Sequence, residues 1–307
     1  MEKIFIATLN QMLVLFIIMI IGYILNKARI TGENTGTILS RLLSNIAMPA
    51  LCFQTFAKNL TRDTIYEKFY IFLCGTCVLL GSLALAYFLA KIFSKDEYVR
   101  RIYTYSFTTA NLGYIGYPVV GGVFGQEALL DMMIFCIPFN IFIYSLGIAM
   151  LKPGSGKISF RGLVNPVFIC MILGAIVGFF NIPLPEFISS TVSSLAACMS
   201  TLAMLLAGFV IAQYDFKKLI LNGRIYIASI LRLIVIPGAI MLVLNRIGVS
   251  HQVLIAALGT TAMPLGLNTI VFPAAYGGDT STGASMALIS NILSIITIPI
   301  MFSIFLL

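Results

Sequence analysis

Polar and helix-breaking residues interrupt an apolar stretch, residues 107–127, that could otherwise cross a membrane as one helix. The interruption combines Asn111 with five glycines and a proline. Backbone without internal hydrogen bonds persists in hydrocarbon only where protein or a water-filled cavity covers it, so we predict a broken helix beside a cavity. Free backbone amides at the start of the second half-helix would suit a carboxylate. The candidate binding residues here are Asn111, Gly113, Tyr114, Gly116 and Pro118.

A second interrupted stretch, residues 260–279, repeats the pattern near the C-terminus. The Thr-Thr-Ala triplet at Thr108 recurs at Thr260, and Phe-Gly-x-Glu at Phe124 recurs as Tyr-Gly-x-Asp at Tyr276, both 152 positions later. Interrupted hydrophobic segments at corresponding positions of two halves point to the binding site of a transporter. This copy supplies three further candidates, which are Pro264, Gly266 and Asn268.

Arg232 is a basic residue deep inside an apolar segment. It lies roughly ten residues from the segment's start, which is about 15 Å along a helix. A charge at this depth is costly and indicates a function with a specific partner. That partner could be an anionic substrate or the carbonyls of a broken helix; alternatively, the side chain reaches the cytoplasmic edge or a neighbouring helix. Weaker polar candidates, which could also serve only to join helices, are Asn45, Asn140, Tyr144 and Asn291.

Other chemically active residues are sparse. All eleven acidic residues lie in predicted loops or at segment ends, which argues against a sodium/proton antiporter or a proton pump. The one histidine, His251, lies at a segment edge, so we expect no Ser/His/Asp set, no catalytic residue and no enzyme. Cys74 and Cys77 form an isolated CxxC, for which helix packing is the simpler explanation, so we expect no metal and no cofactor.

The composition predicts an all-α polytopic membrane protein. Of the 307 residues, 60% are hydrophobic and 10% charged, and the mean hydropathy is +1.03. The net charge of +8 arises in short loops, where it sets topology, so we expect no nucleic-acid partner. We predict ten membrane segments of about 20 residues each, at residues 5–26, 36–57, 69–93, 102–124, 130–151, 162–180, 191–213, 222–244, 252–275 and 283–306.

Loop charge predicts the orientation. Lys and Arg concentrate in the connections after the first, third, fifth and seventh segments. This excess predicts that those connections lie in the cytoplasm and that both termini lie outside it. The membrane that we expect is the cell's inner membrane. Five segments per half is an odd number, so the second half would be inverted relative to the first. The expected organisation is a first repeat at 1–151, a cytoplasmic linker at 152–161 and an inverted second repeat at 162–307.

Over its whole length the sequence resembles the auxin efflux carrier family. The most specific match is Asn-x4-Gly-x-Pro at Asn111, Gly116 and Pro118; residues 263–266, Met-Pro-Leu-Gly, resemble the break in the family's ninth helix. Ser-Asn-Ile-Ala-Met-Pro-Ala-Leu at 44–51 is similar to the family's second-helix signature. The short linker favours the bacterial branch over the plant auxin exporters.

The resemblance implies a fold similar to sodium/proton antiporters and bile-acid symporters, with a scaffold domain and a transport domain. Broken helices four and nine would cross at Pro118 and Pro264, with an anion beside them. Aligning these prolines gives an offset of 146 positions (264 − 118) rather than 152, and we give the prolines precedence.

We therefore expect a secondary active transporter, an efflux carrier or permease, that moves a small organic anion such as a carboxylate by elevator-type alternating access. The lipid bilayer is the other expected partner, and a homodimer is left open. The alternatives are a sodium-coupled carrier of the bile-acid symporter type and a non-transporting membrane sensor. Substrate identity, direction, coupling ion and oligomeric state do not follow from the sequence.

Overall fold

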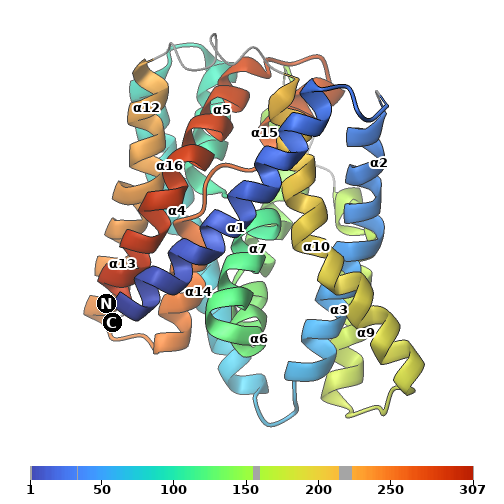
Figure 1. Ribbon diagram of the computed structural model, residues 1–307. Coiled ribbons are helices and arrows are strands. Elements are labelled where there is room, and N and C mark those ends of the chain that lie inside the picture. Colours follow the sequence, from blue (N-terminus) through green and yellow to red (C-terminus); the bar gives the residue numbers. More distant parts are fainter. Residues whose placement is uncertain (1, 33, 155–159, 214–222, 307) are drawn as a thin grey trace.

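The computed structural model is all-helical over the residues it describes, which are 2–32, 34–154, 160–213 and 223–306 (Figure 1). Within these ranges seven helical stretches are long and apolar enough to cross a membrane, and two shorter apolar stretches, Ile137–Leu151 and Pro166–Phe179, accompany them. The protein is therefore a polytopic membrane protein. Part of the predicted linker, residues 155–159, lies outside the described residues, as does the 214–222 connection.

The helices overlap the predicted segments, but the stretch Glu97–Phe135 joins the fourth predicted segment to the start of the fifth, and α14 and α15 divide the ninth. The first half contains α1 (Glu2–Lys27), α2 (Thr35–Leu42), η1 (Leu43–Ala47), α3 (Met48–Asn59), α4 (Ile65–Phe93), α5 (Glu97–Thr108), η2 (Leu112–Gly116), α6 (Tyr117–Phe135), α7 (Ile137–Phe142), η3 (Ile143–Gly147) and α8 (Ile148–Leu151). After η4 (Phe160–Leu163), the second half contains α9 (Pro166–Phe179), α10 (Glu186–Ala212), α12 (Gly223–Ile230), η5 (Leu231–Val235), α13 (Ile236–Ile247), α14 (His251–Thr261), α15 (Asn268–Ala275) and α16 (Ser281–Phe305).

Two groups of helices make up the described part of the chain. The lateral group consists of α1, α2, α3, α9 and α10, in which α1 packs along α10 and α3 along α9. The crossing group consists of α4 to α8 and α12 to α16. Figure 1 shows α2, α3, α9 and α10 on one side, α4, α5, α12, α13 and α16 on the other, and α1 running diagonally between them.

Glycines allow the two helix pairs of the lateral group to touch through backbone. A Cβ on Gly22 of α1 would lie 2.4 Å from the carbonyl oxygen of Leu205 in α10, and a Cβ on Gly174 of α9 would lie 2.5 Å from that of Phe53 in α3. Small residues permit this close packing of membrane helices. Gly174 lies 152 positions after Gly22 (174 − 22 = 152), and its partner Phe53 lies 152 positions before Leu205 (205 − 53 = 152), so the two contacts exchange the halves of the chain.

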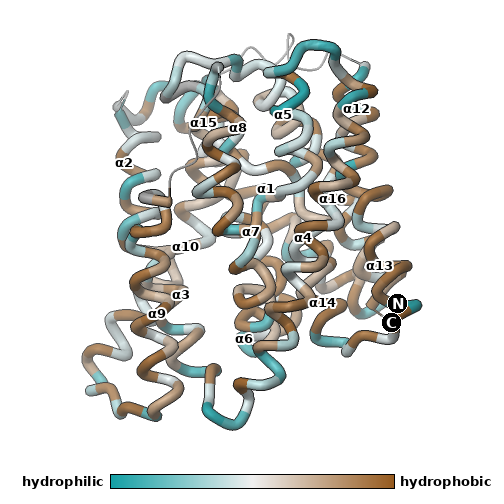
Figure 2. The backbone as a smooth tube through the Cα atoms, turned by 180° about the vertical axis from the view of Figure 1, so that it is seen from behind, coloured by the Kyte–Doolittle hydropathy of each residue, from teal (hydrophilic) through white to brown (hydrophobic). Residues whose placement is uncertain are grey.

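Polar residues gather at two ends of the molecule. Figure 2 shows hydrophilic residues in the connections at both ends and hydrophobic residues along the helices between them. The described termini lie together at one end (Figure 1). This distribution is the one expected for helices whose middle sections lie in a bilayer.

A buried ion pair joins α4 to α6. The Lys68 amine lies 2.5 Å from a carboxylate oxygen of Asp131, and the two side chains are only 5% and 1% exposed. Lys68 lies in the first turn of α4 and Asp131 in the last two turns of α6. The sequence predicted both near the ends of membrane segments, but it did not predict that they are buried or paired. Each charge is buried only because the other compensates it.

Candidate substrate site at the crossing helices

The two broken helices touch at their interruptions. α5 ends at Thr108, and the chain runs without helix to Asn111 before η2 begins; α14 ends at Thr261, and residues 262–267 separate it from α15. The backbone N–H of Asn111 donates a 2.7 Å hydrogen bond to the Pro264 carbonyl. A Cβ on Gly266 would lie 3.4 Å from the Cα of Asn111, so a small residue suits this position.

The crossing is at Asn111 and not, as the resemblance implied, at Pro118. Pro118 lies inside α6, and its carbonyl accepts a hydrogen bond from the Gln11 side chain. Proline lacks an N–H and clashes with the carbonyl four residues earlier, so a preceding helix must widen. The π-helical turn η2 directly before Pro118 is such a widening. Giving the prolines precedence over the 152-residue offset was therefore wrong for the position of the crossing.

Asn111 caps the second half of its broken helix. Its side-chain oxygen accepts a 3.2 Å hydrogen bond from the backbone N–H of Tyr114, as a helix N-cap does. The side chain is 5% exposed, and its amide nitrogen donates no hydrogen bond to any described residue. Because Asn111 lines a cavity, this amide is a donor available to a ligand.

The cavity beside the crossing has a volume of about 80 Å³ and lies between the two helix groups. Six sequence candidates line it, from both breaks and from α7: Asn111, Gly113, Tyr114, Asn140, Gly266 and Asn268. Tyr144, another of the weaker candidates, also lines it, as do residues that the sequence did not single out, among them Ser44 and Met48. No lining residue is charged.

The N-terminal ends of two half-helices face this cavity. Asn111 and Leu112 begin η2, which continues into α6, and Leu267 and Asn268 begin α15; all four residues line the cavity. The Asn268 side chain donates a 3.1 Å hydrogen bond to the hydroxyl of Tyr105. Helix N-termini carry partial positive charge and free amides, so the cavity is electropositive without a charged lining residue.

Arg232 joins the opposite, C-terminal ends of the two broken helices. Its Nε donates a 3.2 Å hydrogen bond to the carbonyl of Thr109, at the end of α5, and its Nη1 donates to the carbonyl of Thr261, at the end of α14. The side chain is 1% exposed and lines none of the cavities described here. Of the partners considered from the sequence, the carbonyls of the broken helices are the ones found.

The remaining candidates do not line the cavity. Asn45 is exposed and bonds to the carbonyl of Arg41. Asn291 donates to the carbonyls of Ala287 and Leu265, so it supports the second break from α16. Gly116 allows η2 to approach α14, since a Cβ there would lie 3.3 Å from the Gly259 carbonyl oxygen.

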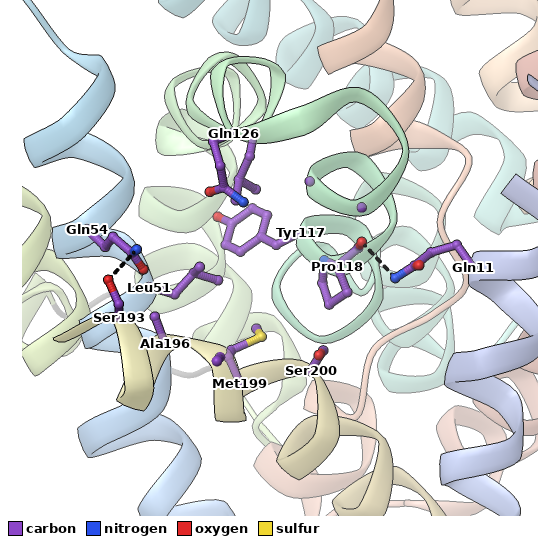
Figure 3. A pocket seen from close by; sticks show the side chains of 14 residues that line it. Gln11, Leu51, Gln54, Tyr117, Pro118, Gln126, Ser193, Ala196, Met199 and Ser200 are labelled. Atoms are coloured by element: carbon purple, nitrogen blue, oxygen red, sulfur yellow. Dashed lines mark hydrogen bonds between the residues drawn. The ribbon is translucent and has the colours of Figure 1, made fainter. Parts of the chain in front are cut away.

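A larger polar cavity of about 370 Å³ adjoins Pro118 (Figure 3). Its polar lining comes from Gln11, Gln54, Tyr117, Gln126, Ser193 and Ser200. Tyr117 also lines a narrow cavity of about 20 Å³, which shares Met48, Asn140 and Tyr144 with the crossing cavity. The three cavities thus follow one another between the helix groups. Glutamines within otherwise apolar segments were the sequence signal for this lining.

Comparison with known proteins agrees with this architecture. The sequence pattern of the family described as membrane transport protein matches residues 7–161 and 155–302. An uncharacterized transporter of Methanocaldococcus jannaschii is 31% identical over 307 residues, covering 95% of this chain and 97% of the relative. An uncharacterized transporter of Methanothermobacter thermautotrophicus is 24% identical over 306 residues, covering 97% and 98%. Both relatives are archaeal rather than bacterial. The chain therefore belongs to the membrane transport protein family, as its resemblance to the auxin efflux carriers predicts.

Proposed function

We propose that this transporter is a secondary active carrier of a small organic anion, a carboxylate, and is not an enzyme. The observation that carries the proposal is the polarity of the crossing. Two half-helix N-termini and the free amide of Asn111 face one cavity, while Arg232 caps both C-terminal ends elsewhere. The half-helix N-termini attract an anion into the cavity. Arg232 offsets the partial negative charges of the C-terminal ends, which would otherwise weaken the binding of that anion.

We further propose two inverted five-helix repeats, with boundaries at 1–151 and 162–307. The Gly22–Leu205 and Gly174–Phe53 contacts support this organisation because they recur 152 positions apart in the two halves. Gly125 and Gly277, also 152 positions apart, both adopt positive φ, 87° and 71°; Gly125 lies at a kink inside α6 and Gly277 lies just after α15. Only glycine adopts such a conformation readily, which explains why the sequence repeat is clear there.

Elevator-type alternating access would follow from movement of the crossing group against the lateral group. The row of cavities between them supports this mechanism, because these cavities interrupt the packing between the two groups. The proposed membrane is the cell's inner membrane, with both termini outside the cytoplasm, as the excess of basic residues at the opposite end suggests.

Thermal stability of the purified protein tests the binding site. We would measure melting with malonate, malate, indole acetate and a bile acid, each with and without sodium. A ligand at about 100 times its Kd stabilises the folded state by about 2.7 kcal/mol, so a selective increase in Tm is expected with one carboxylate. The increase should be lost in Asn111→Ala. Stabilisation that requires sodium would favour the bile-acid symporter type, and an equal response in Asn111→Ala would reject the site.

A further inference from the structure

Arg232 binds the C-terminal ends of both broken helices and keeps one nitrogen without a hydrogen-bond partner among the described residues. Two hydrogen bonds, from Nε to Thr109 and from Nη1 to Thr261, bind it to carbonyls, while its Nη2 is buried without a hydrogen-bond partner among the described residues. Each C-terminal end of a helix carries roughly half a negative charge, so one guanidinium offsets two such ends. The partial positive charge of the N-terminal ends that face the cavity is then not reduced by the partial negative charge of the C-terminal ends.

The formal charges buried in the protein can be counted over the described residues. The buried Lys, Arg, Asp and Glu side chains are Lys68, Asp131 and Arg232. Lys68 and Asp131 form an ion pair with each other and cancel. All three residues lie in the crossing group, whose buried side chains therefore carry a net formal charge of +1.

We propose that Arg232 is a positioning residue that makes the crossing cavity selective for a monoanion. One negative charge in the cavity brings the buried formal charge of the crossing group to zero, whereas a dianion leaves a net negative charge and a neutral ligand leaves the positive one. Uncompensated charge is costly in a medium of low dielectric, so the singly charged ligand is favoured. The inference rests on the proposed carboxylate transport and narrows its substrate class.

A ligand series of one size and three charges tests the selectivity. Malonamide is neutral, malonamate carries one negative charge and malonate carries two, and indole acetamide and indole acetate form a second pair of equal size. We would measure the Kd of each for the wild type, Arg232→Gln, Arg232→Lys and the control Arg246→Gln. Arg246 is exposed in α13, so its substitution removes the same charge from the same membrane stretch.

The wild type, Arg246→Gln and Arg232→Lys should bind a monoanion more tightly than its neutral or doubly charged counterpart. In Arg232→Gln the preference over the neutral amide should fall on the order of tenfold, the effect of a unit charge about 10 Å away at an effective dielectric constant near 20. An unchanged preference in Arg232→Gln, or a wild type that favours malonate, overturns the inference alone. If no member of either series binds, the proposed carboxylate site fails as well.

Arg232→Gln can fail to fold because it leaves two helix ends uncapped, so a second measurement uses the wild type only. In proteoliposomes with saturating monoanion on both sides, labelled substrate exchanges through loaded states alone. A loaded crossing group of zero buried charge predicts an exchange rate that does not change with membrane potential. A clear voltage dependence of this exchange would overturn the inference while leaving the transport function intact.

Discussion

Asn111 has two functions in this account, and they use different atoms. Its side-chain oxygen caps η2 through the Tyr114 N–H, and its amide nitrogen remains free toward the cavity. Replacing it with alanine therefore removes a cap, worth about 1 kcal/mol, along with the donor. A substitution that keeps the cap is needed to separate these effects.

Asn111→Asp makes that separation. Aspartate caps helices as well as asparagine does, so we expect Tm to change little. The new carboxylate would repel a carboxylate ligand, and binding should weaken on the order of tenfold or more. Asn245→Asp is the matched control, because Asn245 is exposed in α13 and does not line the cavity. Equal ligand-induced increases in Tm for Asn111→Asp and the wild type would argue against direct contact.

The ion pair of Lys68 and Asp131 gives a prediction about stability. Removing one partner leaves a buried unpaired charge, so Asp131→Asn should lower the free energy of unfolding by about 3–5 kcal/mol. The double variant Lys68→Met with Asp131→Asn should recover much of this loss. Chemical denaturation in detergent measures both. A single variant as stable as the wild type would mean that the pair is not buried in the membrane-embedded protein.

At the residue scale the sequence located the breaks but not the roles within them. Asn111 and Asn268 stand out because polar residues with glycine and proline are unusual in a membrane segment. The pairing of Lys68 with Asp131 depends on contact between α4 and α6, which no local pattern encodes. The partners of Arg232 likewise depend on where two distant helices end.

At the element scale, three π-helical turns line the cavity, and a fourth, η5, lies outside its lining. η1 and η2 contribute Ser44 and Gly113 to its lining, η3 contributes Tyr144, and η5 carries Arg232. Three of these turns end two residues before a proline. η1 precedes Pro49, η2 precedes Pro118 and η5 precedes Pro237. The sequence predicted the helices from their apolar length, but it treated prolines only as possible breaks. It therefore missed the widened turns.

Cross-linking tests whether the helix groups move. A Cβ on Gly122 in α6 would lie 2.8 Å from the side-chain carbon Cδ of Gln11 in α1, so cysteines at both positions can be joined by a short bis-methanethiosulfonate, which reduction releases. In a cysteine-free background this link between the groups should abolish transport, and reduction should restore it. The control joins Gln54 to Ser193, whose side chains hydrogen-bond at 2.9 Å within the lateral group. Full transport by the linked Gln11–Gly122 pair would contradict the elevator mechanism.

At the scale of the whole molecule, several features recur 152 positions apart. The 152-residue repeat read from the sequence recurs in the Gly22 and Gly174 contacts and in the positive φ of Gly125 and Gly277. Between these points the halves differ, since the second break spans residues 262–267 and the first only 109–111. The sequence could show the repeat where glycine is required, but it could not show how the halves pack.

Membrane orientation gives a test at this scale. Single cysteines at Thr61 and Asn181, in the α3–α4 and α9–α10 connections, should react with an impermeant maleimide added outside cells. A cysteine at Ser94, before α5, should react only after the membrane is opened. The reason is that basic residues concentrate at the end of the molecule that includes Ser94. Labelling of Ser94→Cys from outside would reverse the proposed topology.

Counterflow in proteoliposomes tests directly whether the protein transports a carboxylate through the crossing cavity. Vesicles containing the purified protein would be loaded with unlabelled malonamate or indole acetate and diluted into a trace of the same labelled acid, without sodium. We predict transient accumulation of label by the wild type and by Asn245→Asp, and none by Asn111→Asp. Absence of accumulation in the wild type with every acid that stabilises it, or equal accumulation by Asn111→Asp, would contradict carboxylate transport through the crossing cavity.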